Sequence, residues 1–315
     1  MSGMQLFLYC AFAIFLAGNV RVVVRYLTMP LHLRWELYPV AHEKGRGYGG
    51  SYLEDVDWWK KTRKKSLTHE LKFMVPEILF IRALYHHNRK LWIVSFPFHA
   101  GLYLLVVFLV FMIIGAIGQG LGMEITATNS GFFSRLVFYA TAVTGSVGLI
   151  SALLGCSGLF VLRVMDDELR RNSVPIDFAH LILIMCVLVS ACVTWLSADQ
   201  SFSAARTYVT GLITFEPVKV PAAWFGIQMV LTGVFFMYFP FSHMTHMFTK
   251  YFTYHRVRWD DEPNVKGSKM EARVRALLDR PIRWSAPHIP TGKRWKDIVE
   301  EQTDGNKEGN SSRYK

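Results

Sequence analysis

Residues 91–115 read LWIVSFPFHAGLYLLVVFLVFMIIG and contain no Asp, Glu, Lys or Arg. A helix needs ~20 apolar residues to cross the ~30 Å hydrocarbon core of a bilayer, and this run exceeds that length. The whole chain is 51% hydrophobic, with a mean hydropathy of +0.22. This stretch therefore predicts a membrane protein. His99 lies within it, and an imidazole in hydrocarbon is costly enough to be a functional hypothesis by default.

Four further apolar runs predict four more membrane-spanning helices. They are Leu6 to Gly18 (extended by Val20 to Val24), Leu136 to Leu162, Phe178 to Leu196, and Ala222 to Phe241. Nothing basic precedes the first run and Arg21 follows it, a pattern that favours a retained helix over a cleaved signal peptide. The predicted fold is an all-α membrane protein with five transmembrane helices.

The basic residues are concentrated in alternate connections between the spans. Thirty of the 35 Lys and Arg residues lie in 28–90, 163–177 and 249–315. By the positive-inside rule, the N-terminus is expected outside and the C-terminus in the cytoplasm, in a multi-pass protein of the cytoplasmic (inner) membrane. The net charge of +11 then belongs to flanks that face anionic lipid headgroups, and it does not indicate nucleic-acid binding.

The sequence divides into five predicted regions. They are transmembrane helix 1 (1–27), a long cytoplasmic and interfacial loop (28–90), transmembrane helices 2–5 as a haem-binding bundle (91–250), a cytoplasmic tail for partner docking (251–300) and a disordered end (301–315). In the loop, the tryptophans at 58–59 beside a Lys/Arg run are typical of an interfacial belt, and 67–85 has the periodicity of an amphipathic helix. In the tail, Ser268 and Glu271 have capping-box spacing and open a short helix ending near Leu278.

The four cysteines exclude two kinds of redox centre. Cys10, Cys156, Cys186 and Cys192 all fall in apolar spans, and none belongs to a C-x-x-C motif. The sequence therefore predicts no intrinsic iron–sulfur cluster and no covalently attached c-type haem.

Two histidines lie near the same predicted end of different spans. At ~1.5 Å per residue, His99 and His246 lie about 8–12 Å from the cytoplasmic surface on antiparallel helices. Such a pair can supply both axial ligands of one haem iron. A single histidine near a helix end can instead hydrogen-bond a carbonyl. His243 is either a rival ligand or a hydrogen-bond donor to a haem propionate.

A fourth histidine lies at the start of the fourth span. His180 is expected to be structural, because Asp177 and either Arg170 or Arg171 offer polar partners nearby.

Two motifs carry a resemblance to a known family. Phe98-His99-Ala100-Gly101 is similar to F-H-x-G, and the segment 239–242 (FPFS) followed by His246 is similar to F-P-F-S-x-x-x-H. The chain resembles the gamma subunit of respiratory nitrate reductase, and still more the membrane cytochromes b paired with heterodisulfide-reductase-like iron–sulfur proteins in anaerobes. The resemblance implies one haem b on the inner side, ligated by His99 and His246.

The chain departs from this family at the second, outer haem. The family's outer ligands fall on Leu109 and Gln228, so bis-histidine ligation of a second haem is not expected. Arg135 falls near the family's quinone-contacting lysine and is the quinone candidate.

These observations predict an electron-transfer subunit. By resemblance, a b-type cytochrome would pass electrons between membrane quinone, implied to be menaquinone, and a cytoplasmic heterodisulfide-reductase-like iron–sulfur partner. Direction of flow is not encoded in these features. The alternatives are a non-redox membrane anchor, which needs no histidine pair, and a transporter, which would typically show repeats and broken helices.

Overall fold

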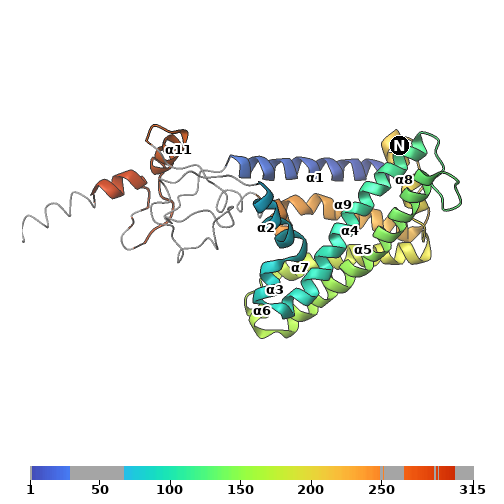
Figure 1. The fold of residues 1–315 in the computed structure, drawn as a ribbon, viewed down its shortest axis with the longest axis horizontal. Helices are drawn as coiled ribbons and strands as arrows, with labels where there is room; N and C mark the ends of the chain where they lie inside the picture. The colour runs from blue at the N-terminus through green and yellow to red at the C-terminus, as the bar shows by residue number, and fades with distance from the viewer. Residues whose placement is uncertain are drawn as a thin grey trace, which may run out of the picture. The chain divides into compact units, whose positions relative to one another are not determined.

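The described part of the chain is almost entirely helical (Figure 1). The computed structural model describes residues 2–28, 67–248, 251, 266–286, 289 and 291–301. Its helices are α1 (Gly3–Leu27), α2 (Leu67–Phe80), α3 (Arg82–His87), α4 (Arg89–Gly120), α5 (Phe132–Met165), α6 (Asp167–Arg171), α7 (Pro175–Ser197), α8 (Ser203–Thr214), α9 (Ala223–Tyr238) and α11 (Lys269–Leu278), with 3-10 turns η2 (Phe239–Phe241) and η3 (His243–Thr245). Within these residues there is no β-strand, only two isolated bridges.

Five helices are long and apolar enough to cross a membrane, which confirms the predicted spans. They are α1, α4, α5, α7, and α9 together with η2. Large apolar side chains point away from the protein along these helices, including Ile93, Val106 and Leu154, each at least 60% exposed. Such surfaces suit contact with lipid. The chain is a multi-pass membrane protein, whereas the orientation of its termini stays a prediction.

The chain forms two compact units. The first comprises Met1–Val22 and Lys72–Thr245, and the second Val23–Leu71 and His246–Lys315. The first unit therefore contains four of the spans and most of α1.

In the first unit, α4 and α5 lie side by side and run antiparallel (Figure 1). Glycines allow this approach: a Cβ atom at Gly155 would lie 2.2 Å from the Phe98 nitrogen, and one at Gly101 would lie 2.3 Å from the Ala152 nitrogen. Small residues at such contacts let membrane helices pack backbone to backbone. We call this contact between α4 and α5, formed at Gly101–Ala152 and Phe98–Gly155, the seam. It fixes the position of α4 in the segment that carries His99.

An ion pair joins the ends of α4 and α5. Lys90 Nζ lies 2.7 Å from Asp166 Oδ2, and Asp166 Oδ1 accepts hydrogen bonds from the backbone nitrogens of Glu168 and Leu169 at the start of α6. The hydrogen bond from Lys90 is the largest cause that lowers the pKa of Asp166 below its usual range. Asp166 thus caps α6 while holding the turn against α4.

The described tail of the second unit is a small folded element. Ser268 Oγ accepts from the Glu271 nitrogen at 3.1 Å, and Glu271 accepts from the Gly267 nitrogen at 2.6 Å, so α11 begins where the predicted cap placed it. The side chains of Ile282 and Ile298 are buried within this element, at 3% and 5% exposure. The Ile282 nitrogen donates a hydrogen bond to the Lys293 carbonyl oxygen (2.9 Å), which closes the loop between these two residues.

Two sequence predictions differ from the observed elements. The single amphipathic helix predicted over 67–85 is two helices, α2 and α3, because Ile81 between them adopts a left-handed conformation (φ 50°). The connection 197–221 contains α8. The interfacial belt at 58–59 and the end beyond 301 lie outside the described residues.

Candidate functional site

His99 lies on an aromatic face of α4. Residues three, four and seven apart share one side of a helix, so Trp92, Phe96 and Tyr103 lie on the same side as His99. Trp92 and Phe96 stack at 5.0 Å between ring centroids. The Trp92 indole and the Tyr103 hydroxyl each donate to a backbone carbonyl of α2, both at 2.8 Å. The imidazole therefore lies in a stripe of flat, apolar rings.

The hydrogen bonds of His99 fix which ring nitrogen carries the proton. His99 Nδ1 lies 2.8 Å from the Ser95 carbonyl oxygen and 3.3 Å from Ser95 Oγ. A carbonyl oxygen accepts only, so Nδ1 carries the proton and donates, and Nε2 of the neutral ring keeps its lone pair. Metal-ligating histidines typically donate their second ring nitrogen to such a carbonyl. The hydrogen bond to Ser95 therefore identifies Nε2 as the ring nitrogen with the chemistry of a metal ligand.

His243 and His246 follow the end of α9 but belong to different units. Pro240 in η2 ends the helical run after Tyr238, and His243 begins η3 in the first unit. His246 is the first residue of the second unit after this turn. The pairing of His99 with His246 accordingly stays a prediction.

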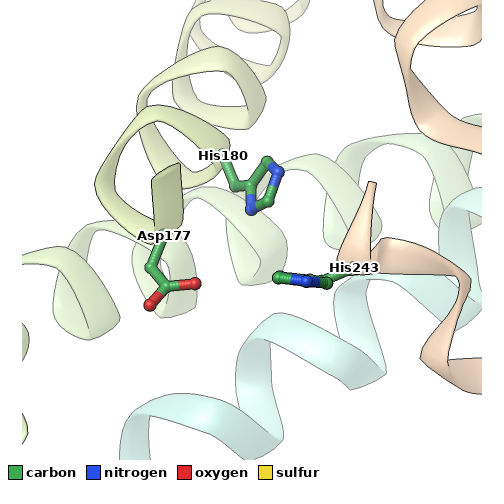
Figure 2. Close-up of side chains that lie close together, drawn as sticks. All are labelled: Asp177, His180 and His243. Carbon is green, nitrogen blue, oxygen red and sulfur yellow. The ribbon is translucent and has the colours of Figure 1, made fainter. Parts of the chain in front are cut away.

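His243 lies in a cluster with Asp177 and His180 (Figure 2). One ligand atom from each of the three side chains lies within 4.8 Å of the others. The His180 and His243 rings meet edge to face at 5.9 Å between centroids. His180 is buried, and its Nε2 lies 2.7 Å from the Tyr238 hydroxyl.

Asp177 lies beside His180 as expected, but the arginine near them is a different one. Arg163 on α5 lies 3.5 Å from Asp177, in the place expected for Arg170 or Arg171. Arg170 instead pairs with Asp167 inside α6 (2.6 Å). Asp167 and Arg170 lie three residues apart on α6 and face each other, so Arg170 pairs within its own helix.

Comparison with known proteins adds an independent line of argument. The sequence profile of the nitrate reductase gamma subunit family matches residues 83–260, more than half of the chain. The chain belongs to this family. The nitrate reductase gamma chain of Bacillus subtilis (strain 168) is 29% identical over 121 residues, 34% of this chain and 54% of that relative. The match thus spans about half the length of that relative. No solved structure matches the chain significantly.

Membership of the nitrate reductase gamma family indicates a membrane cytochrome b electron-transfer subunit. The matched region includes α4, α5, α7 and α9, and with them His99, His180, His243 and His246.

Leu109 and Gln228, where the resemblance predicted that outer haem ligands would be missing, have well-defined surroundings in the structure. Leu109 is 46% exposed on the outer face of α4. Gln228 accepts a hydrogen bond from Ser190 Oγ and donates one to Thr232 Oγ1 at 2.9 Å. A leucine side chain offers iron no ligand, and the amide of Gln228 is engaged in tying α9 to α7.

The quinone candidate Arg135 lies away from His99. Arg135 is exposed in the first turn of α5. It lies 20 residues from Gly155, which faces the segment of α4 beside His99, hence about 30 Å along the helix axis. Gly101, beside His99, faces the backbone of Ala152 on α5, and Gly233 faces the ring of Phe7 from α1.

Sequence reasoning missed a buried cation on α8. Arg206 is 2% exposed and donates from Nη1 to the Ile125 carbonyl oxygen at 3.1 Å. The carboxylate of Asp199 accepts from the nitrogens of Ala204 and Ala205 and thereby starts the helix. The sequence offered one signal for the start of α8, because an acidic residue, Asp199, comes shortly before Ala204 and Ala205.

Proposed function

We propose that this protein is a b-type cytochrome subunit that holds one haem between His99 and His246 and transfers electrons between membrane quinone and a cytoplasmic iron–sulfur partner. The observation that carries the proposal is the hydrogen bond from His99 Nδ1 to the Ser95 carbonyl oxygen. It supports Nε2 as the nitrogen that would bind the iron, and His99 lies inside the family-matched region. When bound, haem supplies a one-electron centre whose potential depends on its ligands and burial.

The chain's own residues serve three purposes in this proposal. His99 and His246 bind the iron, and Trp92, Phe96 and Tyr103 provide flat apolar surface beside the first ligand. The Ser95 carbonyl orients the imidazole and raises its basicity, which stabilises the oxidised iron. The test is a reduced-minus-oxidised visible spectrum of the purified protein, with haem quantified per chain. One haem b per chain supports the proposal, whereas a colourless protein would favour a non-redox anchor.

The proposed docking surface for the iron–sulfur partner is formed by 28–90 and the tail 251–300. In the described tail, Trp284 is 51% exposed and meets Trp295 edge to face at 5.9 Å. Arg280 and Arg283 are exposed and form no ion pair within the described residues, which leaves two positive charges within four residues of Trp284 in the sequence. Exposed aromatic anchors within a charged rim are typical of protein interfaces. We infer that a heterodisulfide-reductase-like partner binds here.

Deleting 264–300 is expected to leave the haem spectrum unchanged while it abolishes co-purification of an iron–sulfur protein and quinone-linked turnover. The deletion removes α11 and the loop around Ile282, but no residue of the first unit. Affinity purification with iron and labile-sulfide analysis measures the effect. A truncated protein that retains its partner and turns over normally would exclude the tail as the docking element.

The proposed topology has a direct test of its own. A reporter fused after Lys315 is expected to read cytoplasmic, and one inserted in 120–130 to read external, because 30 of the 35 basic residues lie in the connections assigned to the inside. Paired alkaline phosphatase and fluorescent-protein fusions give opposite signals for the two sides. The reverse pattern of signals would overturn the orientation and, with it, the cytoplasmic partner.

A further inference from the structure

Asp177, His180 and His243 bring three metal-binding groups together outside the proposed haem ligand pair. Their ligand atoms lie within 4.8 Å of one another, and all three residues belong to the first unit. Asp177 and His180 lie in the first two turns of α7, whereas His243 comes from the turn after α9. Figure 2 shows one ring nitrogen of His180 facing the space between the other two side chains.

Tyr238 determines which nitrogen of His180 is available. Its hydroxyl lies 2.7 Å from His180 Nε2, so the nitrogen that faces Asp177 and His243 is Nδ1. When Nε2–H donates to Tyr238, the lone pair of Nδ1 points toward the cluster. An outer hydrogen bond of this kind fixes the tautomer and orientation of a metal-binding histidine.

Asp177 is positioned by contacts that use one of its oxygens. Oδ2 accepts from the Val174 nitrogen at 3.0 Å and lies 3.5 Å from the Arg163 guanidinium. Oδ1 accepts no hydrogen bond from any other described residue. The carboxylate is therefore fixed at the start of α7 with one oxygen left for a ligand, and Arg163 competes with a cation for the other.

We propose that Asp177, His180 and His243 form a binding site for a divalent first-row transition cation of the Zn²⁺ class. Two imidazole nitrogens and one carboxylate oxygen are the donor set that Zn²⁺ accepts, and three protein ligands leave a fourth position for water. The cation links the start of α7 to the turn that follows α9. The site does not depend on haem, since neither His99 nor His246 contributes to it.

The first experiment titrates Zn²⁺ into the chelator-treated, purified full-length protein and measures stoichiometry after dialysis. One Zn²⁺ per chain is expected, with imidazole nitrogens at ~2.0–2.1 Å in zinc-edge X-ray absorption. His243→Ala and Asp177→Asn are each expected to abolish this stoichiometric binding. His87→Ala, which removes an exposed histidine on α3, is the matched control and keeps it.

Two further variants separate ligation from a merely structural role. Tyr238→Phe removes only the outer hydrogen bond and is expected to weaken Zn²⁺ binding by about 10- to 100-fold. Arg163→Gln removes the competing cation and is expected to tighten binding, a change in the opposite direction that misfolding would not produce. Haem content measured on the same samples distinguishes this proposal from the cytochrome assignment. Unchanged Zn²⁺ stoichiometry in both His243→Ala and Asp177→Asn would overturn it, as would binding lost equally in His87→Ala.

Discussion

His99→Ala is expected to yield a membrane-inserted protein that contains no haem b. The substitution removes the Nε2 lone pair that we propose binds the iron, and the methyl side chain of alanine offers no replacement ligand. It leaves the packing seam intact, because Phe98 and Gly101 make the contacts between α4 and α5. Pyridine haemochrome analysis of the purified protein measures the loss, and His246→Ala is expected to give the same result.

Two controls make this prediction specific. Ser95→Ala removes only the hydroxyl at 3.3 Å, while the carbonyl at 2.8 Å remains, so haem is expected to stay bound. His243→Ala is expected to retain haem with at most a shifted potential, since that side chain lies against His180 and Asp177. Full haem in both His99→Ala and His246→Ala would refute bis-histidine ligation by this pair, and loss in His243→Ala alone would make His243 the ligand.

The spans were predictable because their signal is local. A run such as 91–115 has no acidic or basic residue and must bury its backbone polar groups within a helix, so length and composition determine the element. The start of α11 was equally local, since Ser268 and Glu271 are three residues apart. α8 was missed because it is short and because Arg206 and Gly211 interrupt its apolar pattern.

The side-chain clusters were not predictable, because their members lie far apart in the sequence. His180 and His243 carry no spacing motif, and their approach depends on how α7 packs against α9. The role of a glycine was equally hard to predict from sequence. A glycine beside a candidate ligand suggests room for a cofactor, but Gly101 packs against the backbone of Ala152. Residue type indicates what a position can do, and the partner helix determines which use is made of it.

Gly155→Leu is expected to prevent the bundle from assembling. A single Cβ atom at this position would already lie 2.2 Å from the backbone nitrogen of Phe98, and backbone cannot rotate away as a side chain can. Gly155→Ala is therefore expected to destabilise the folded state by about 1–3 kcal/mol or more, the range for overpacked cores. Leucine would separate α4 from α5 along the segment that positions His99. Thermal stability in detergent and the yield of monodisperse protein measure both effects.

Gly3→Leu is the matched control, because no atom lies within 4 Å of a Cβ at that position. It adds the same bulk to another spanning helix and is expected to leave stability and haem content unchanged. Gly155→Ala and Gly155→Leu also test whether haem binding depends on the contact between α4 and α5, since separation of the two helices displaces His99 without removing it. Loss of haem in Gly155→Leu together with retention in Gly3→Leu is the expected outcome. A Gly155→Leu protein with normal stability would show that the two helices do not meet at this glycine.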